Sequence, residues 1–460
     1  MIGLGPVIGV GWITGVGIWI SQSGSVGAVL AFLVGGLAVL LVGLCYAEMC
    51  SISSNSGGEI AYAKQAFGQG GAFAAGWMLV LIYIAATAFE GISFGWVVSA
   101  FAPSVREHVV YRAFGQPVSQ VALLSGACGL ALVASINFTG SRAVSRFQRI
   151  STYTKLALAI SVIVLGVNFG RTHHLDPAFV SDDARTAFSG CLLVVLTTPF
   201  WLAGFNTVTQ AFSERSRAVT ARQMAGVVLC TIGVATLFYC LVIIAVSMSM
   251  SRGELLSMDL PGAGALDALL GRGAGRIALS AGLFGLFSAW NALFFAQTRV
   301  LADMSRRGFM PSFLNLHSAH ERAPRSAVVA CAVLGAFGVA CGKGAIVPIL
   351  DAASACVAAV FALVAACVIV LRWRQRDLHR PFKVPCGTAV AATACVLSCG
   401  LFALSVRQSF AQDSKGFPVV TGILTVWPLL GVVLYAFRRK SVCAIEAQPG
   451  AASLGEPGTQ

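Results

Sequence analysis

The chain has 460 residues, of which 57% are hydrophobic and only 11% are charged, and its mean hydropathy is +0.82. These values exclude an ordinary soluble globular domain and indicate a polytopic membrane protein. The formal net charge of +13 suggests a nucleic-acid or anionic-lipid partner, unless the basic residues divide unequally between the two sides of a membrane.

Apolar stretches long enough to cross the hydrocarbon core, which takes about 20 helical residues, recur along the whole chain. The sequence therefore predicts an all-α polytopic membrane protein with twelve transmembrane helices. They are expected at residues 2–25, 27–50, 73–101, 118–137, 150–170, 187–211, 223–249, 275–300, 326–342, 345–372, 388–406 and 417–437.

The basic residues divide unequally between the two sides of this arrangement. Loops on the side of the two termini carry 21 of the 31 Lys and Arg residues. Positively charged loops stay in the cytoplasm, so we expect cytoplasmic termini and a plasma-membrane location. The positive charge is thus mainly a topology signal, and no nucleic-acid partner is expected.

Small residues interrupt the first predicted helix over Gly11–Ile18. In hydrocarbon, a chain leaves the helical state only where the freed backbone is buried in protein or lines a cavity. A half-helix that begins at such a break presents its positive end to an anion such as a carboxylate, and the carbonyls before it attract an ammonium. The predicted anion receptors are the amides of Gly15, Val16 and Gly17, and the predicted ammonium receptors are the carbonyls of Ile13 and Thr14.

Glu90 lies deep in the third predicted helix. A carboxylate at that depth is costly, which makes it a candidate functional residue. It can recognise an amine of a cationic substrate or titrate in proton coupling. The alternative is a structural carboxyl that bonds Thr87, Ser93 or a neighbouring helix.

A second interruption, Pro199–Asn206, falls in the sixth predicted helix. Carbonyls near Phe200 and Ala203, followed by Gly204, can accept an ammonium there. Aromatic side chains near the breaks are candidates for pocket walls or lids, because an aromatic face attracts a cation. Packing is the alternative for the aromatic residues, and close helix packing is the alternative for each glycine motif. The candidates in this region and in helix 8 are Phe200, Trp201, Phe205, Asn206 and Trp290.

The two interrupted helices each open a block of five, so the second block has the opposite membrane orientation. Paired interruptions in two halves point to a transporter's substrate site. The expected divisions are a first five-helix repeat at 1–172, a second at 173–374, peripheral or oligomerising helices 11–12 at 375–440, and a disordered cytoplasmic tail at 441–460.

No residue pattern predicts a metal site, another cofactor or an enzyme. The 14 cysteines lie mostly in apolar spans, where Cys acts as a small hydrophobe, and no zinc-ligand spacing occurs. The six histidines fall in predicted loops, and no nucleophile–base or paired-carboxylate arrangement lies within the spans.

Taken together, these motifs resemble those of the amino acid/polyamine/organocation (APC) superfamily of permeases. The resemblance implies a leucine-transporter-like fold of 5+5 inverted repeats with broken helices 1 and 6. It also implies a substrate held between helices 1, 3, 6, 8 and 10, and alternating access. The motifs that carry it are Gly15-Val16-Gly17, Cys45-Tyr46-Ala47-Glu48, Ser56-Gly57-Gly58-Glu59, Ala66-Phe67-Gly68, Ala203-Gly204-Phe205-Asn206, Ser288-Ala289-Trp290-Asn291 with Arg299, and Arg380-Pro381-Phe382-Lys383-Val384-Pro385.

Lys155 resembles, by position, the lysine that replaces a coupling sodium ion in sodium-independent relatives by bridging helices 1 and 8. The alternative is a lysine that snorkels to the headgroups. Two positions depart from the family pattern. Members often carry a Ser between the helix 1 glycines, where this chain has Val16, and an acidic residue where Asn206 stands.

The sequence therefore predicts a sodium-independent permease, proton-coupled or exchanging, for an amino acid or related amine. Its expected partners are that small-molecule substrate and the lipid bilayer, and the sequence leaves the oligomeric state open. The alternatives are a polyamine or organic-amine permease without carboxylate recognition, and a channel.

Overall fold

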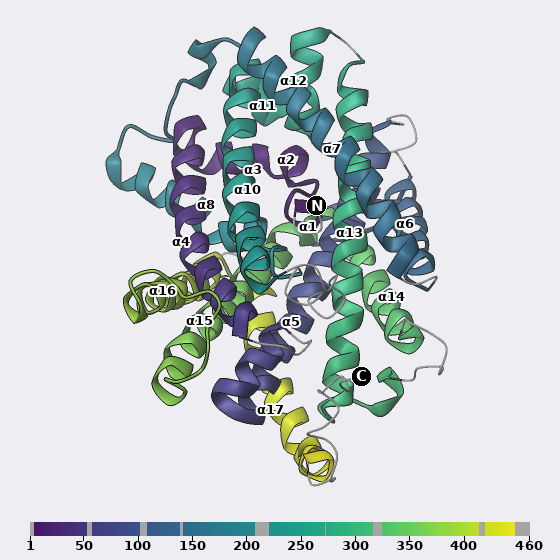
Figure 1. Cartoon of the computed structure of the whole chain (residues 1–460). Helices are drawn as coiled ribbons and strands as arrows, with labels where there is room; N and C mark the ends of the chain where they lie inside the picture. Colours follow the sequence, from purple (N-terminus) through teal and green to yellow (C-terminus); the bar gives the residue numbers. More distant parts are fainter. Residues whose placement is uncertain are drawn as a thin grey trace.

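The computed structural model describes residues 4–52, 58–101, 108–138, 141–207, 220–271, 273–315, 324–413 and 419–446. These residues form a bundle of helices that run in both directions around three short helices in its middle, as Figure 1 shows. The fold in the described residues is thus mainly α-helical, as the apolar stretches predict.

The first half of the chain begins with short helices and continues with long ones. Gly68, with φ +74° and ψ −159°, divides the longest of them, α5, at a kink. The elements are α1 (Leu4–Val7), α2 (Gly11–Thr14), α3 (Val16–Ser23), α4 (Ser25–Ile52), α5 (Gly58–Phe101), β1 (Val109–Ala113), β2 (Gln116–Ser119), α6 (Gln120–Phe138), α7 (Ser141–Phe169) and η2 (Thr172–Leu175).

The second half begins at a capped helix, because the Asp183 carboxylate accepts the Thr186 amide at 2.8 Å. Its elements are α8 (Ala184–Leu202), α10 (Ala221–Ser249), α11 (Arg252–Ser257), α12 (Pro261–Leu270), α13 (Gly275–Arg306), η4 (Ser312–Asn315), α14 (Arg325–Ala340), η5 (Lys343–Ala345), α15 (Ile346–Arg374), α16 (Thr388–Asp413) and α17 (Val419–Glu446).

Strands β1 and β2 pair as an antiparallel hairpin, which corrects the all-α expectation. Its turn has positive φ at Phe114 (+49°) and Gly115 (+74°), which suits a two-residue hairpin. The apolar-span pattern did not predict this hairpin because such a pattern detects only segments that cross the hydrocarbon core.

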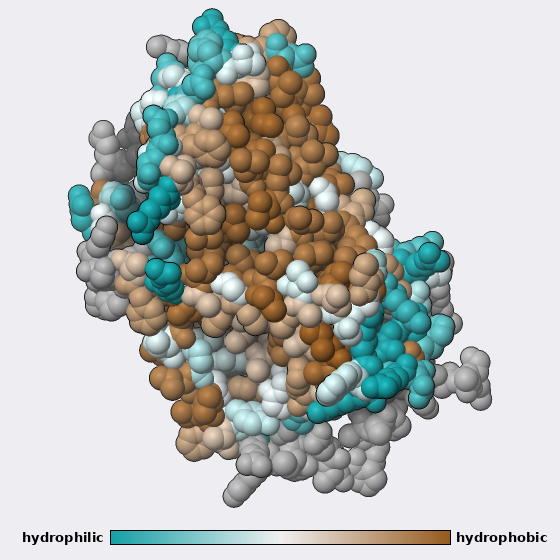
Figure 2. Space-filling view, turned by 90° about the vertical axis from the view of Figure 1, so that its left-hand side faces the viewer, coloured by the Kyte–Doolittle hydropathy of each residue, from teal (hydrophilic) through white to brown (hydrophobic). Residues whose placement is uncertain are grey.

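Ten helices in the described residues are long and apolar enough to cross a membrane. The regions expected at 2–25 and 326–342 instead hold shorter apolar helices, Gly5–Thr14 and Arg325–Ala340. Figure 2 shows a broad, continuous hydrophobic surface over the middle of one face, with hydrophilic residues gathered toward its edges. A surface of this kind suits contact with lipid chains, so the chain is a multi-pass membrane protein.

The last helix, α17, continues to Glu446, so residues 441–446 of the segment expected as a disordered tail have helical backbone. Residues 447–460 lie outside the described residues.

Glu48 joins α4 to the end of α15 and the loop after it. Its side chain is 1% exposed, and its carboxylate accepts hydrogen bonds from Nε of Arg372 at 2.9 Å and from Nη2 of the same residue. The amide of Val384 donates to it at 2.8 Å, and Nε of Arg380 lies 3.3 Å away. A buried carboxylate needs such partners because an unpaired charge is costly there.

Replacing Arg372 with alanine should therefore lower the stability of the purified protein. Hydrogen bonds to a charged group are worth about 1.5–3 kcal/mol, and Arg380 and Val384 still contact Glu48, so we expect a loss of about 2 kcal/mol. The measurement is the apparent melting temperature in detergent. Arg376→Ala, at an exposed position in the loop after α15, is the control and should leave it unchanged. Equal melting temperatures for the two variants would contradict the stabilising role of this ion pair.

Candidate functional site

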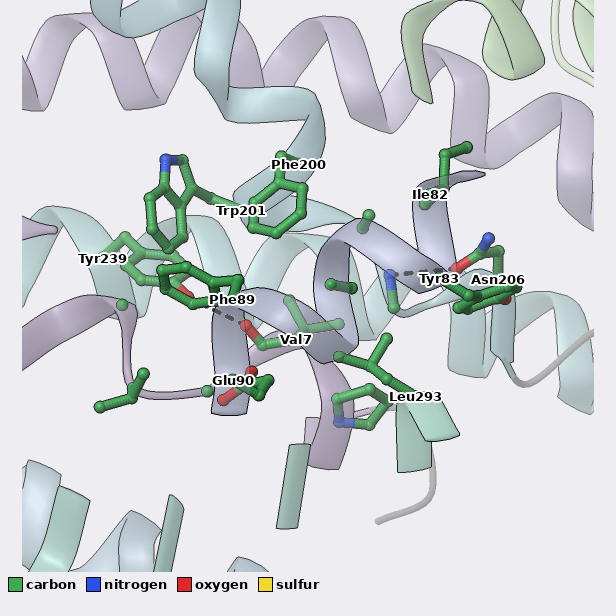
Figure 3. A pocket seen from close by; sticks show the side chains of 17 residues that line it. Val7, Ile82, Tyr83, Phe89, Glu90, Phe200, Trp201, Asn206, Tyr239 and Leu293 are labelled. Carbon is green, nitrogen blue, oxygen red and sulfur yellow. Dashed lines mark hydrogen bonds between the residues drawn. The ribbon is translucent and has the colours of Figure 1, made fainter. Parts of the chain in front are cut away.

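A cavity of about 50 Å³ lies where the first helices meet the end of α8. Its lining comes from three parts of the chain: residues 6–11, one face of α5, and the end of α8, with one residue each from α10 and α13. Figure 3 shows Phe200 and Trp201 on one side of it, with Glu90 and Asn206 well apart from each other. A cavity of this size holds at most a few water molecules, so it is smaller in the described conformation than an amino acid.

The helical backbone at the start of the chain is interrupted between Val7 and Gly11. The carbonyl of Val10 accepts the amides of Ile13 at 2.8 Å and Thr14 at 3.2 Å, so a new helix begins there. The first amides of a helix have no partner within it. Because Gly9, Val10 and Gly11 line the cavity, these amides begin a helix at its wall.

At Gly15, the predicted position of the interruption, α2 also ends and α3 begins, but the backbone there stays close to helical. Gly15 has helical angles (φ −94°, ψ −26°), and its amide donates to the Gly11 carbonyl at 2.7 Å. A Cβ at Gly15 would lie 2.8 Å from the ring of Trp19, and one at Gly17 would lie 2.8 Å from Pro261. Both glycines allow close packing, which is the alternative considered for them above. The cavity lining includes none of the five predicted backbone receptors Ile13, Thr14, Gly15, Val16 and Gly17.

Helix α8 ends at Leu202, and the chain turns sharply in the next two residues. Ala203 is extended (φ −62°, ψ 168°), and Gly204 has φ +106°, which side chains other than glycine rarely adopt. The amide of Gly204 donates to Oδ1 of Asn206 at 3.1 Å. Ala203, Gly204 and Asn206 all line the cavity, so this part of the second predicted interruption is at the site.

The aromatic candidates divide into two groups. Phe200 and Trp201 line the cavity, and both pack edge-on against the α5 residue Phe89, with ring centroids 5.9 Å and 5.6 Å away. Phe205 is fully buried and packs instead against Tyr46 and Phe361, with ring centroids 5.1 Å and 5.7 Å away. Trp290 is not among the lining residues, and it stacks with Phe287. Phe205 and Trp290 therefore serve in packing, which is the alternative considered for them above.

Glu90 lies at the cavity wall and is 4% exposed. Its Oε2 has no hydrogen-bond partner among the described residues. A Cβ added at Gly9 would lie 3.1 Å from its Oε1, so the carboxylate sits directly beside the interrupted backbone. Neither Thr87 nor Ser93 bonds it, because the Thr87 hydroxyl contacts Gln297 and two carbonyls of its own helix, and the Ser93 hydroxyl is unpaired. A buried carboxylate oxygen without a donor is suited to receive an ammonium or a proton.

Lys155 of α7 is fully buried and contacts the end of α1. Its Nζ donates to the carbonyls of Gly5 and Ile8, each at 2.5 Å, and lies 3.3 Å from the hydroxyl of Ser288 in α13. The ammonium therefore bridges the first helix and α13, the eighth expected span, and its head does not extend to the membrane surface.

Tyr239 of α10 is a site residue that the sequence did not indicate. Its hydroxyl donates to the Val7 carbonyl at 2.9 Å, and its ring lines the cavity. Together with Lys155, it satisfies three carbonyls at the end of the first helical segment. A single Tyr within an apolar helix carries no local signal of such a contact.

Comparisons with known proteins identify the family of the chain. A family model described as amino acid permease matches residues 4–429. The chain is 25% identical over 451 residues to the branched-chain amino acid permease BcaP of Bacillus subtilis (strain 168), which covers 96% of this chain and 91% of that protein.

Two further relatives are named for different substrates. The Asc-type amino acid transporter 1 of Mus musculus is 30% identical over 453 residues, or 94% of this chain and 80% of its own length. The methylthioribose transporter of Bacillus subtilis (strain 168) is 26% identical over 402 residues, or 84% of this chain and 82% of its own length. The family match and these relatives confirm the resemblance stated above: the chain belongs to the amino acid permease family of the APC superfamily and is a transporter of amino acids or related compounds.

Proposed function

We propose that this protein carries a neutral amino acid across the plasma membrane by alternating access and binds it in the cavity beside Glu90. In this proposal the chain has twelve spans in two inverted five-helix repeats, with cytoplasmic termini. The observation that carries the proposal is the meeting of two non-helical backbone segments, Ile8–Val10 and Ala203–Gly204, at one small cavity. Interrupted helices of this kind bind the charged ends of a substrate in transporters.

The two charged groups of an α-amino acid find different partners here. The amides at the start of α2 provide a positive end for the carboxylate, and α2 continues through Gly15 into α3, which lengthens the dipole. The ammonium is received by the Glu90 carboxylate and by carbonyls at the end of α8. At the cavity, the residue between the two glycines is Val10 of Gly9-Val10-Gly11. Val10 contributes no hydroxyl, so the substrate carboxylate depends on backbone amides alone.

The remaining walls select the substrate side chain. Ile82, Ala86, Phe89 and Leu293 are apolar, which favours a small aliphatic side chain over a charged one. Two relatives, named as a branched-chain amino acid permease and an Asc-type amino acid transporter, agree with such a preference.

A second candidate substrate class is an organic amine or another small polar compound without a carboxylate. Val10 at the cavity offers no hydroxyl to a carboxylate, which favours this second class. The relative named as a methylthioribose transporter favours it too. Uptake of labelled compounds into proteoliposomes distinguishes the classes. Saturable uptake of small neutral amino acids, abolished by converting the carboxylate to an amide, supports the first. Uptake of amines alone would contradict it.

Transport is proposed to be independent of sodium, because the Lys155 ammonium already links α1 to α13. Replacing sodium by choline in the uptake buffer should leave the initial rate within about twofold, a difference of under about 0.5 kcal/mol. A requirement for sodium would contradict this part of the proposal. Counterflow with unlabelled substrate then separates a carrier from a channel, because only a carrier exchanges one substrate molecule for another.

Glu90→Gln is expected to raise the KM for uptake by about tenfold, because a hydrogen bond to a charged group contributes about 1.5–3 kcal/mol and the amide keeps only part of it. Initial rates over a range of substrate concentrations measure this effect. Asp182→Asn, at an exposed acidic position, is the matched control. If both variants behave like the unchanged protein, Glu90 has no part in binding.

A further inference from the structure

A second buried carboxylate, Glu59, lies in the first turn of α5, outside the cavity lining. Its side chain is 1% exposed. Its Oε1 accepts two hydrogen bonds, from Nδ2 of Asn206 at 3.0 Å and from the hydroxyl of Tyr46 at 3.0 Å. These three groups come from α4, from the start of α5 and from the segment after α8, so one carboxylate oxygen joins three parts of the chain.

The contact with Asn206 extends to the backbone of the cavity. While Nδ2 of Asn206 donates to Glu59, Oδ1 of the same amide accepts the Gly204 amide at 3.1 Å. Gly204 has φ +106°, and a Cβ there would lie 3.0 Å from the backbone of Pro6 and Val7. Glu59 thus contacts, through Asn206, the point where the turn after α8 closely approaches the end of α1.

The orientation of the Asn206 amide depends on this carboxylate. An amide side chain presents one acceptor and one donor group, and it can rotate to exchange them. A carboxylate can only accept, so Glu59 requires Nδ2 to point toward it. The Oδ1 atom then points toward Gly204, whose amide has no helical partner because α8 has ended.

We propose that Glu59 is a positioning residue that orients Asn206 and thereby sets the position of the Gly204 backbone at the substrate site. This inference deepens the proposed function and rests on it. Glu59 itself contacts no substrate. Its effect reaches the cavity through Asn206, which is a lining residue.

The place of Glu59 in α5 also connects the site to the part of the helix before the kink at Gly68. Gly68 divides α5 at a kink, so residues 58–67 form a separate helical segment that carries Glu59. A change in the angle at Gly68 would move the carboxylate and, through Asn206, the Gly204 backbone. The hydrogen bond therefore couples the start of α5 to substrate binding.

Exchanging the carboxylate at position 59 with the amide at position 206 tests the inference. In Asn206→Asp, two carboxylates face each other where Nδ2 now bonds Oε1, so the hydrogen bond is lost and like charges repel. In the double variant Glu59→Gln/Asn206→Asp, the new Gln amide donates to the new Asp carboxylate, which still accepts the Gly204 amide. In Glu59→Gln alone, the Gln oxygen accepts as the carboxylate did.

The expected KM for uptake rises by tenfold or more in Asn206→Asp. It stays within about threefold of the unchanged protein in Glu59→Gln and in the double variant, a difference of about 0.7 kcal/mol or less. The amount of protein in the membrane and its melting temperature are measured for all variants. If Glu59 had only a structural role, the substitutions would change the amount of protein and its melting temperature and leave KM unaltered.

Two results would overturn the inference: a normal KM for Asn206→Asp, or a double variant no better than Asn206→Asp alone. If Asn206→Asp does not fold, the double variant still decides, because its KM must return to the normal range. Failure of the proposed function looks different, since the unchanged protein would then take up no amino acid at all.

Discussion

Lys155→Ala is expected to reduce uptake by at least about thirtyfold, the largest loss among the variants considered. The side chain is fully buried, and its Nζ donates to the carbonyls of Gly5 and Ile8. Removing it leaves two buried acceptors unpaired at about 1–3 kcal/mol each. The lower bound of about 2 kcal/mol corresponds to about thirtyfold. Initial uptake rates in proteoliposomes, normalised to protein content, measure the loss.

Lys64→Ala is the control for this variant, because Lys64 is an exposed lysine that contacts none of the cavity residues. It should keep full uptake. A second assay repeats the uptake by Lys155→Ala with sodium present, since a sodium ion can occupy the place of an ammonium between two carbonyls. Unchanged uptake by Lys155→Ala would show that the bridge between α1 and α13 is unnecessary for transport.

Gly204→Ala is expected to have the second largest effect and to lower uptake by tenfold or more. The backbone at Gly204 has φ +106°, which costs a side-chain-bearing residue about 1–3 kcal/mol. The added Cβ would also lie 3.0 Å from the carbonyl carbon of Pro6 and from the amide nitrogen of Val7. The turn after α8 and the end of α1 must then separate, which changes the backbone on both sides of the proposed substrate site.

Gly226→Ala provides a matched comparison. Gly226 lies within α10, where an added Cβ meets no atom within 4 Å, and alanine favours the helix. We expect normal uptake from this variant. Comparable losses in the two variants would mean that glycine-to-alanine changes act on the bundle as a whole, and the close approach at Gly204 would then have no special role.

The interruption in the first helix shows where local sequence reasoning succeeded and where it failed. The chain contains Gly9-Val10-Gly11 and Gly15-Val16-Gly17 within one apolar stretch, and the two have the same spacing. Hydropathy and glycine content do not distinguish them. Pro6, which lies close to the first pair and further from the second, was the available signal, because proline disturbs a helical backbone. The choice depends partly on a distant residue, since Pro261 packs against Gly17, whereas Trp19, which packs against Gly15, is only four residues away.

Lys155 and Asn206 show a related limit. Their residue types and positions made them candidates, but their contacts join residues far apart in the sequence. The lysine contacts Gly5 and Ile8, and the asparagine contacts Glu59. Glu59 was visible only as part of a family motif, and nothing in its neighbourhood indicated a partner in the sixth expected span.

The sequence by itself determined the properties that depend on local composition. It showed a membrane protein, it located the apolar stretches, and it marked Glu90 and residues 203–206 as unusual in a hydrocarbon environment. Each of these follows from the free energy of transferring a residue into lipid, which is a property of the segment alone.

The tertiary structure decided which glycine pair opens the first helix, which carbonyls Lys155 and Tyr239 satisfy, and how Glu59 orients Asn206. These features arise where freed backbone groups must find hydrogen-bond partners inside the bundle, and those partners come from whichever helices pack beside them.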